Sequence, residues 1–450
     1  MNTLARNFDK EFLDMTPVDW ILTVPAVWGD AAKALMMRAA VEGLGEKASI
    51  QLISEPDAAA VCTLKDLQPN HLKVDDVFVV ADCGGGTVDL ISYQIMALHP
   101  NPEIKECAVG TGGMCGSTYI DKNFENFVRS RVGPEFNHIK PKGRDAMLKY
   151  FGEFLKPAFA DDEDEDIFSC PIPGIANNPA TSVESGFFIL TREDMRDIFE
   201  PIIMKIVNLV QGQIDVVEAR QRGGSSGGQQ TLDVSAILLV GGLGASEYLR
   251  QRLLSDLRIK GGAPIHIMQP TNAWSAVVRG AVLRGLEGGI VHSRMARRNY
   301  GISYSSDYDP KRHLKSERVY SQFDGHPEVL NCGSWYIQTG DVVSENQPIS
   351  CRFVCRVWSG WDGIITVKLL ASDLTVAPEK TDTADSYPMC KLTSDMTKIS
   401  RDIFPWKVSL TGREYYEIFC DLVMTVQSAV QVFEFQFEKK TYGTVIAKYY

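Results

Sequence analysis

The chain has 450 residues, enough for about three domains, and its 44% apolar and 23% charged residues exclude a disordered tail, a coiled rod and a collagen-like chain. Forty-six basic against 57 acidic residues give a net charge of −11 without a Lys/Arg-rich block, so we predict no binding to nucleic acid. No apolar run approaches the roughly 18 residues that cross a membrane, so we expect no membrane contact.

The first part of the chain alternates short strands with helices. Apolar residues predict a strand at Ile21–Val24, and helix formers predict a helix over Ala31–Leu44. Gly45 directly follows that helix, as is typical of a helix C-cap. A second strand is predicted at Ile50–Ile53 and a second helix at Asp57–Lys65.

The same alternation continues further along the chain. Val77–Ala81 predicts a buried strand that runs into a glycine turn, and Val88–Ile95 predicts its antiparallel partner. Ala236–Val240 repeats the pattern of buried strand and glycine turn, followed by a helix at Glu247–Leu257 and a further helical stretch at Ala273–Leu286. This order predicts an α/β architecture.

Three segments interrupt the alternation, and the last marks a domain boundary. The acidic run Asp161–Asp166 is predicted to be a solvent-facing loop, and Gly223–Gly228 a flexible connector. Gly288 and Gly289 follow a helix, and we place the domain boundary there. Beyond about residue 290 the chain consists of short β-branched and aromatic runs.

These runs predict an antiparallel sheet with one face exposed to water. Phe433, Phe435 and Phe437 fall on one side of the last run, and we interpret this aromatic stripe as core rather than as a binding surface. The runs are Ser350–Val357, Gly363–Leu370, Glu417–Val426 and Val430–Phe437.

The N-terminus and the cysteines bear on the compartment. The first dozen residues carry charges where a signal peptide would be apolar, so we expect a cytoplasmic protein. The ten cysteines include no Cys-x-x-Cys pair, and we interpret Cys351 and Cys355 as buried small hydrophobes. The histidines show no paired spacing, so a zinc site is not predicted.

The strongest local signal is the segment Asp82–Asp89, which reads Asp-Cys-Gly-Gly-Gly-Thr-Val-Asp. Three consecutive glycines let backbone N–H groups approach an anion without an intervening Cβ, so a phosphate could bind there. Asp82 and Asp89 could hold a hydrated divalent cation or orient a water, and Thr87 adds a hydroxyl. The alternative is a glycine-rich hairpin with acidic flanks and no ligand.

Two other glycine clusters are weaker candidates. Gly241–Gly244 follows a buried strand and opens a helix, where free N–H groups favour phosphate, although any strand-to-helix turn uses glycine. Gly110–Ser117 could approach a ligand or be a mobile loop. Glu55, at the end of a strand, is free to point into a cleft, and Asp57 could cap the helix that follows.

Other enzyme motifs are not found: no G-x-S-x-G sequence stands between a predicted strand and a predicted helix as a nucleophile elbow, and no G-x-x-x-x-G-K-[ST] loop occurs. The motifs that are present resemble, in order and spacing, those of the actin-like ATPase superfamily. The likeness covers roughly residues 15–290 and is strongest to the nucleotide-binding domain of the seventy-kilodalton heat-shock (DnaK-like) chaperones, in a divergent eukaryotic branch. The motifs are Leu22–Ala26, Ile53–Pro56, Asp82–Asp89 and Leu239–Gly242.

The resemblance implies an actin-like ATPase (ribonuclease H-like) fold that binds ATP or ADP with Mg²⁺. By resemblance Asp82 orients the attacking water, and Glu55 and Asp89 lie around the water shell of the magnesium, which no side chain ligates directly. The remaining implied contacts are Gly84, Gly85, Gly86 and Thr87 in the second phosphate loop, Gly110, Gly116 and Ser117 in a later turn, Glu153 and Lys156 at the ribose, and Gly241, Gly242 and Gly244 at the adenosine.

The sequence also departs from the family pattern. No Asp-x-Gly-Thr-Thr turn, the family's first phosphate loop, is found, and Ala245 and Ser246 stand where the chaperones place an arginine against adenine. We therefore expect an N-terminally incomplete fold, with a remnant of lobe I at 1–72, lobe II at 73–289 with a helical subdomain at about 118–230, and a β-rich domain at 290–450.

Two functions remain open from the sequence. One is a chaperone-like ATPase whose nucleotide state is coupled to a β-rich domain that binds unfolded peptide or a co-chaperone. The other is a degenerate interaction module that does not hydrolyse ATP. A sugar or acetate kinase on the same fold is disfavoured, because the Glu55–Pro56 segment and the β-rich end suit the chaperones better.

Overall fold

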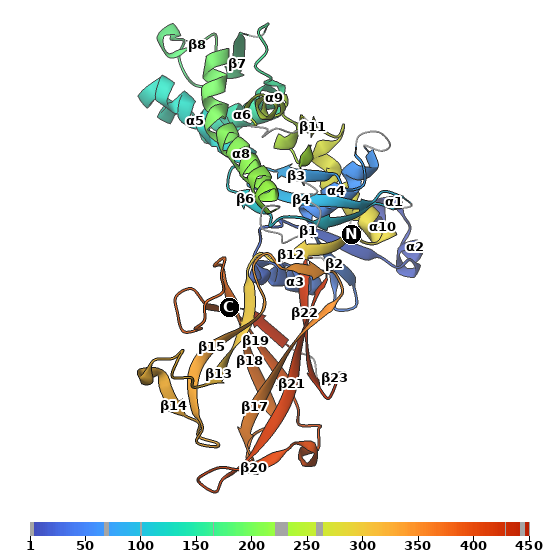
Figure 1. Cartoon of the computed structure of the whole chain (residues 1–450). Helices are drawn as coiled ribbons and strands as arrows, with labels where there is room; N and C mark the ends of the chain where they lie inside the picture. Colours follow the sequence, from blue (N-terminus) through green and yellow to red (C-terminus); the bar gives the residue numbers. More distant parts are fainter. Residues whose placement is uncertain are drawn as a thin grey trace. The chain divides into compact units, whose positions relative to one another are not determined.

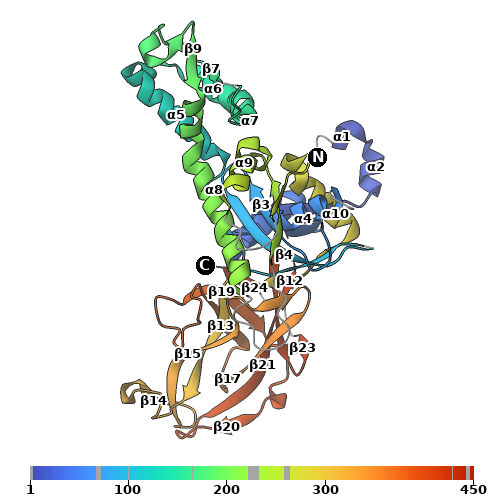
Figure 2. The same cartoon turned by 45° about the horizontal axis from the view of Figure 1, so that its top comes forward.

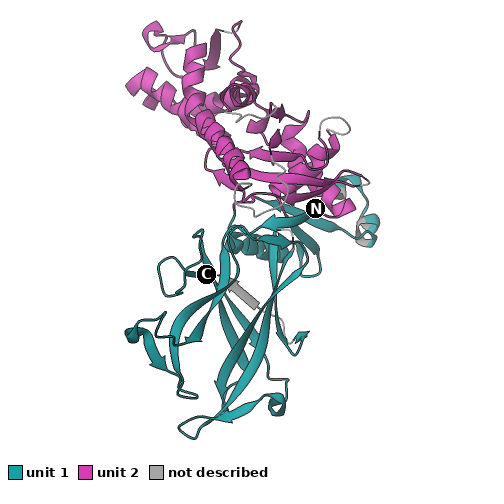
Figure 3. Ribbon diagram, viewed as in Figure 1, with its two compact units in different colours: residues 1–24, 28–52, 292–450 teal, residues 25–27, 53–291 magenta. Residues whose placement is uncertain are grey.

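The structure, a computed structural model, separates into two compact units that each have their own hydrophobic core. Unit 1 contains residues 1–24, 28–52 and 292–450, and unit 2 contains residues 25–27 and 53–291 (Figure 3). The described residues are 4–66, 72–99, 101–164, 166–220, 233–257, 264–427, 429–441 and 446–449.

A mixed sheet forms the centre of unit 2 (Figure 1). Its neighbouring strands are, in order, β11 (His266–Met268), β10 (Val234–Val240), β3 (Val77–Cys83), β4 (Val88–Ala97) and β5 (Glu103–Glu106), and β6 (Thr111–Gly113) also pairs with β4. β10 runs parallel to β3, with Val240 beside Asp82, whereas β3 and β4 are antiparallel. The carboxyl ends of β3 and β10 therefore meet at one edge of the sheet.

Helices cover both faces of this sheet because the side chains of β3 alternate between two cores. Val77, Val79 and Ala81 pack with α5 (Ser117–Val132), α8 (Arg192–Arg220) and α9 (Glu247–Asp256). Phe78 and Val80 pack with α4 (Glu55–Asp66) and α10 (Ala276–Glu287). Burial of every residue of β3 makes it the central strand of the unit.

A helical subdomain continues the first of these cores. Figure 2 shows its elements gathered at the N-terminal end of α8. The rings of Phe124 and Phe151 stack there with centroids 3.9 Å apart. The elements are α5, a 3₁₀ segment (Gly133–His138), α6 (Pro141–Tyr150), a π-helical turn (Phe151–Leu155), α7 (Lys156–Ala158) and the small sheet of β7 (Ile167–Pro171), β9 (Phe187–Thr191) and β8 (Val183–Glu184).

Most of unit 1 consists of antiparallel sheets. One sheet has the order β14 (Arg318–Tyr320), β15 (Pro327–Ile337), β13 (Asn299–Asp307), β18 (Ile364–Ser372), β19 (Tyr387–Asp395) and β24 (Ile446–Tyr449). The other has the order β17 (Pro348–Trp358), β21 (Glu414–Gln427), β22 (Val430–Phe437) and β23 (Lys440–Thr441), with β20 (Trp406–Val408) also paired to β21. β12 (Val291–Met295) pairs with β16 (Val342–Ser344).

The N-terminal elements of the chain also belong to unit 1. They are α1 (Leu4–Asn7), α2 (Lys10–Met15), and a two-stranded sheet of β1 (Asp19–Val24) and β2 (Ser49–Ser54) joined by α3 (Asp30–Leu44). Val24 and Leu52 pack with Ala429, and the hydroxyl of Tyr300 donates to Asp30 Oδ2 at 3.1 Å. Residues 28–52 therefore cluster with the β-rich part, and the three-part division drawn from the sequence stays a prediction.

The structure confirms the predicted strands and helices to within a few residues, including the C-cap at Gly45, with φ 101°. It also confirms that Phe433, Phe435 and Phe437 are core, since all three are buried. The acidic run is a loop in its described residues, but its prediction as wholly solvent-facing was wrong for Asp161, whose carboxylate accepts from Arg196 at 2.7 Å. The predicted connector Gly223–Gly228 lies outside the described residues.

Cys351 is buried and Cys355 half-buried, close to the predicted burial of the pair. Among the described residues, no helix combines the length and the apolar character needed to cross a membrane.

Candidate functional site

The hairpin of β3 and β4 places two carboxylates and a glycine turn side by side. The predicted antiparallel pairing of the two strands is confirmed, and Asp82 and Asp89 are direct cross-strand partners. The turn between them is closed by the N–H of Gly84, which donates to the carbonyl of Thr87 at 3.0 Å. We call residues 84–87 the glycine turn.

The start of α5 holds the glycine turn from one side. The N–H groups of Gly116, Ser117 and Thr118 donate to the carbonyls of residues 86, 84 and 85 at 3.2, 3.0 and 2.9 Å, respectively. A Cβ at position 116 would lie 2.5 Å from the backbone carbon and oxygen of Gly85, so only glycine permits this approach. Every carbonyl of the three glycines is therefore occupied by α5.

This arrangement orients the N–H groups of the glycine turn. In a trans peptide unit the N–H points away from the C=O of the same unit. The three occupied carbonyls share their peptide units with the N–H groups of Gly85, Gly86 and Thr87, which must point away from α5. Within the described part of the chain, these three N–H groups meet no acceptor, and residues 85 and 86 are exposed. Successive unpaired N–H groups of this kind, two of them on exposed residues, are a donor set that can bind an anion.

Protein packing does not explain the glycines of the turn itself. A Cβ at Gly86 would meet no atom within 4 Å, one at Gly85 would make an ordinary contact with Thr118, and one at Gly84 would lie 3.5 Å from Thr87 O. None of these glycines has a positive φ. Alanine would therefore fit, and the absence of side chains leaves room for something outside the protein.

Three carboxylates lie within one another's electrostatic field beside this turn. Burial, and then the charges of Asp82 and Asp89, raise the pKa of Glu55 to about 7. Burial and the charge of Asp89 raise the pKa of Asp82 to about 6. Among the described residues, no three His, Cys, Asp or Glu side chains are grouped to ligate a metal directly. The donor set fits a cation that keeps its waters, as Mg²⁺ does.

Two backbone features that the sequence did not reveal fix these carboxylates. The N–H of Val27 donates to Asp89 Oδ1 at 3.1 Å, so the Pro25–Val27 segment lies against β4. α4 begins at Glu55, and one turn later it crosses α10 so closely that a Cβ at Gly280 would overlap the carbonyl oxygen of Ala58. Small residues at that crossing hold the N-terminus of α4, and with it Glu55, in place.

Asp57 is not the cap of α4. The N–H of Asp57 donates to the hydroxyl of Ser54 at 3.3 Å, which makes the serine the capping group. The carboxylate of Asp57 is buried and accepts from the Tyr93 hydroxyl at 2.5 Å.

The second glycine turn, Gly241–Gly244, contacts the end of β3. Gly241 has φ +83°, and a Cβ there would lie 2.5 Å from Cys83 O and 2.6 Å from Asp82 Oδ1. This glycine is required by the fold and brings the end of β10 against Asp82. Gly242 has open space around its Cβ position, whereas Gly244 packs closely on β10.

Only part of the third glycine cluster, Gly110–Ser117, lies at the site. Gly116 and Ser117 contact the glycine turn, as described above, whereas Gly110 lies just before β6. The structure thus brings the later part of the cluster to the site.

The predicted ribose pair lies on the helical subdomain and has partners there. Lys156 Nζ pairs with Asp121 of α5 at 2.7 Å, and Glu153 lies 3.9 Å from Lys149 Nζ. The role of Glu153 and Lys156 toward a nucleotide stays a prediction.

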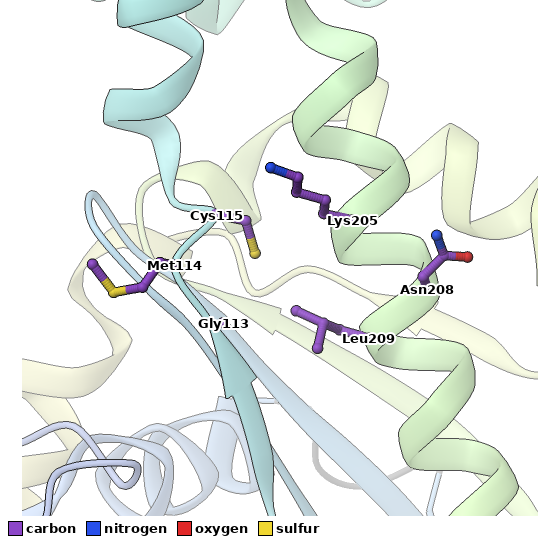
Figure 4. A pocket seen from close by; sticks show the side chains of 6 residues that line it. All are labelled: Gly113, Met114, Cys115, Lys205, Asn208 and Leu209. Atoms are coloured by element: carbon purple, nitrogen blue, oxygen red, sulfur yellow. The ribbon is translucent and has the colours of Figure 1, made fainter.

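A hollow of about 360 Å³ opens between the end of β6 and α8 (Figure 4). The side chain of Lys205 extends toward the loop that carries Cys115, and Leu209 points at the strand. None of the residues that the family resemblance assigns to the nucleotide lines it. Its lining is Gly113, Met114, Cys115, Lys205, Asn208 and Leu209.

Comparison with known proteins finds relatives of this chain by sequence. No family model matches the chain. The chain is 24% identical to heat shock 70 kDa protein 12B of Homo sapiens over 373 residues, covering 66% of this chain and 52% of the relative. It is 25% identical to the human protein 12A over 389 residues, covering 70% and 55%. A mitochondrial-type heat shock protein 70 of Encephalitozoon hellem is 26% identical over 286 residues, covering 61% and 42%.

The sheet with helices on both faces, the glycine turn between two carboxylates and the β-rich part define an actin-like ATPase fold followed by β-structure. Within that class, the chain is a divergent relative of the seventy-kilodalton heat-shock proteins. The chain spans about half the length of the human relatives that it matches.

Proposed function

We propose that the chain binds ATP or ADP with Mg²⁺, and that the glycine turn binds the phosphates. The main support is the orientation of the N–H groups of Gly85, Gly86 and Thr87. They point away from α5, because α5 donates hydrogen bonds to the carbonyls of the same peptide units. Glycines that neither packing nor backbone conformation requires at positions 85 and 86 support a ligand at that surface.

We further propose slow ATP hydrolysis, with Asp82 orienting the attacking water. A buried carboxylate whose pKa is raised to about 6 is still mainly ionised at neutral pH, and a pKa near the working pH suits a general base. Glu55 and Asp89 would hold the water shell of Mg²⁺, which neutralises phosphate charge when bound. The adenosine would lie along the second turn, where the Cβ position of Gly242 is open.

The wider role follows from the relatives and is also a proposal. The printed names of the similar proteins are those of heat-shock proteins, which supports a chaperone-like role. The cytoplasmic location and the partner, unfolded peptide or a co-chaperone, are carried over from the sequence analysis. In this proposal the β-rich part binds the client. The competing function is an interaction module that binds nucleotide without hydrolysing it.

The test is calorimetric titration with Mg–ATP, Mg–ADP and AMP, followed by single-turnover phosphate release. Because the turn would bind the β- and γ-phosphates, we expect ATP and ADP to bind measurably more tightly than AMP. Equal binding of all three, or no binding, would contradict the site. Binding of ATP without phosphate release would favour the non-hydrolysing module.

A further inference from the structure

α8 carries a fully buried glutamine on the face that packs against β6. Leu209 and Gln213 are one helical turn apart, and Val217, one turn further, is in the hydrophobic core. Leu209 lies so close to β6 that a Cβ at Gly113 would be 2.9 Å from its Cδ1 (Figure 4). Gln213 thus stands where the helical period calls for an apolar residue.

The amide of Gln213 is satisfied by three hydrogen bonds. Its Nε2 donates to the hydroxyl of Ser92 on β4 at 2.9 Å and to the carbonyl of Val109 at 3.2 Å. Its Oε1 accepts from the hydroxyl of Thr111 on β6 at 2.9 Å. Two of the three bonds therefore go to the segment that enters β6, and one goes to the sheet beneath it.

That segment leads directly into the site. β6 has only three residues, and its register places Gly112 opposite Asp89 and Thr111 opposite Leu90. The chain then reaches Gly116, which begins the contacts of α5 with the glycine turn. A strand this short has few ladder bonds of its own, so an anchor at its start fixes where its end lies.

We propose that Gln213 is a positioning residue, which anchors β6 so that the start of α5 holds the glycine turn with its N–H groups outward. The effect on nucleotide affinity rests on the proposed function; the effect on the turn does not. An ordinary core role would be to satisfy the buried Ser92, and that role would need no bond to Val109 or Thr111.

The experiment compares three single variants. Gln213→Leu removes the whole amide at similar volume, and Thr111→Val removes one hydroxyl and keeps the glutamine. Val217→Ala is the matched control, because it opens a gap on the same helix face without touching β6. Hydrogen exchange of the amides at Gly116, Ser117 and Thr118 is measured in each variant under conditions where it stays folded.

We expect Gln213→Leu to speed exchange at these three amides by about tenfold relative to Val217→Ala, because a buried anchor is lost. Thr111→Val should also speed exchange at these amides, by a smaller factor. This variant still tests the proposal if Gln213→Leu does not fold. The double variant Gln213→Leu/Thr111→Val should exchange these amides no faster than Gln213→Leu alone, since Gln213 and Thr111 act through the hydrogen bond between them. Exchange equal to that of Val217→Ala in both single variants would make Gln213 a core residue only.

A nucleotide titration on the same proteins separates the two proposals. If the parent binds Mg–ATP, Gln213→Leu should lower that affinity by about tenfold while Val217→Ala leaves it within about twofold. If the parent binds no nucleotide, the proposed function fails, and the exchange rates still decide the role of Gln213. Affinity unchanged in Gln213→Leu despite faster exchange would contradict the link between the anchor and the site.

Discussion

The two glycine turns at the edge of the central sheet use glycine for different reasons. At Gly241 a positive φ and the closeness of Cys83 leave no room for a side chain, so the fold itself requires the glycine. At Gly85 and Gly86 the backbone is unstrained and the space outside is open. The same residue type thus marks a structural constraint in one turn and space for a ligand in the other.

We expect the largest effect from a change at Asp82, which lies next to both glycine turns. Asp82→Asn should lower the rate of ATP hydrolysis by about 10²–10⁴-fold, because it removes the group that orients the water. The N–H groups of the glycine turn remain, so nucleotide affinity should change little. Single-turnover hydrolysis and calorimetry on the same protein check both statements. Hydrolysis at the parent rate would show that Asp82 only caps the hairpin.

The second turn should respond in stability. Gly241→Ala should lower the free energy of unfolding by about 2–4 kcal/mol, because alanine is strained at φ +83° and its Cβ would overlap Cys83 O. Gly242→Ala is the control, since its Cβ meets open space, and it should change stability by less than about 1 kcal/mol. Urea unfolding of both variants measures the difference. Equal stability of the two variants would contradict the claim that the fold requires glycine at position 241.

The first turn should respond in binding instead. Gly85→Val should lower nucleotide affinity at least about tenfold by blocking the approach of phosphate, and leave the free energy of unfolding within about 1 kcal/mol. Calorimetry and urea unfolding give the two numbers. If Gly85→Val lowered the free energy of unfolding but bound nucleotide normally, the first turn would be structural and would not bind the ligand.

The remaining effect is a pH dependence of stability. Burial raises the pKa of Glu55 from 4.5 to about 7 and that of Asp82 from 3.8 to about 6. The folded state then binds more protons than the unfolded state between about pH 4 and pH 7, so the free energy of unfolding should fall as the pH rises through this window. Glu55→Gln should flatten this fall, as urea unfolding at several pH values would show. An unchanged slope in Glu55→Gln would place the titration elsewhere.

Local pattern predicted the parts of the site that are close in sequence. The apolar run before Asp82 and its antiparallel continuation were enough to predict a hairpin with Asp82 and Asp89 at its two ends. The structure adds the register, in which the two are direct cross-strand partners. The clamp by Gly116 could not be read from the residues alone, since it depends on a backbone contact between segments some thirty residues apart.

Other features of the site could not be predicted either, because they also depend on contacts between segments that are distant in the sequence. The bond from the N–H of Val27 to Asp89 carries no side-chain signature, so no pattern reveals it. Gln213 did leave a signal, a polar residue in an apolar row with Leu209 and Val217, but a sequence does not say which strand that row faces. The packing of Val24 and Leu52 with Ala429, far along the chain, is likewise not visible in the sequence.

The most direct test of the central claim is to follow the backbone amide resonances of the protein during a titration with Mg–ATP. The account predicts that the amides of Gly85, Gly86 and Thr87 shift together and saturate with the calorimetric affinity, because their N–H groups bind the phosphates. ATP binding that leaves these three resonances unmoved would contradict it.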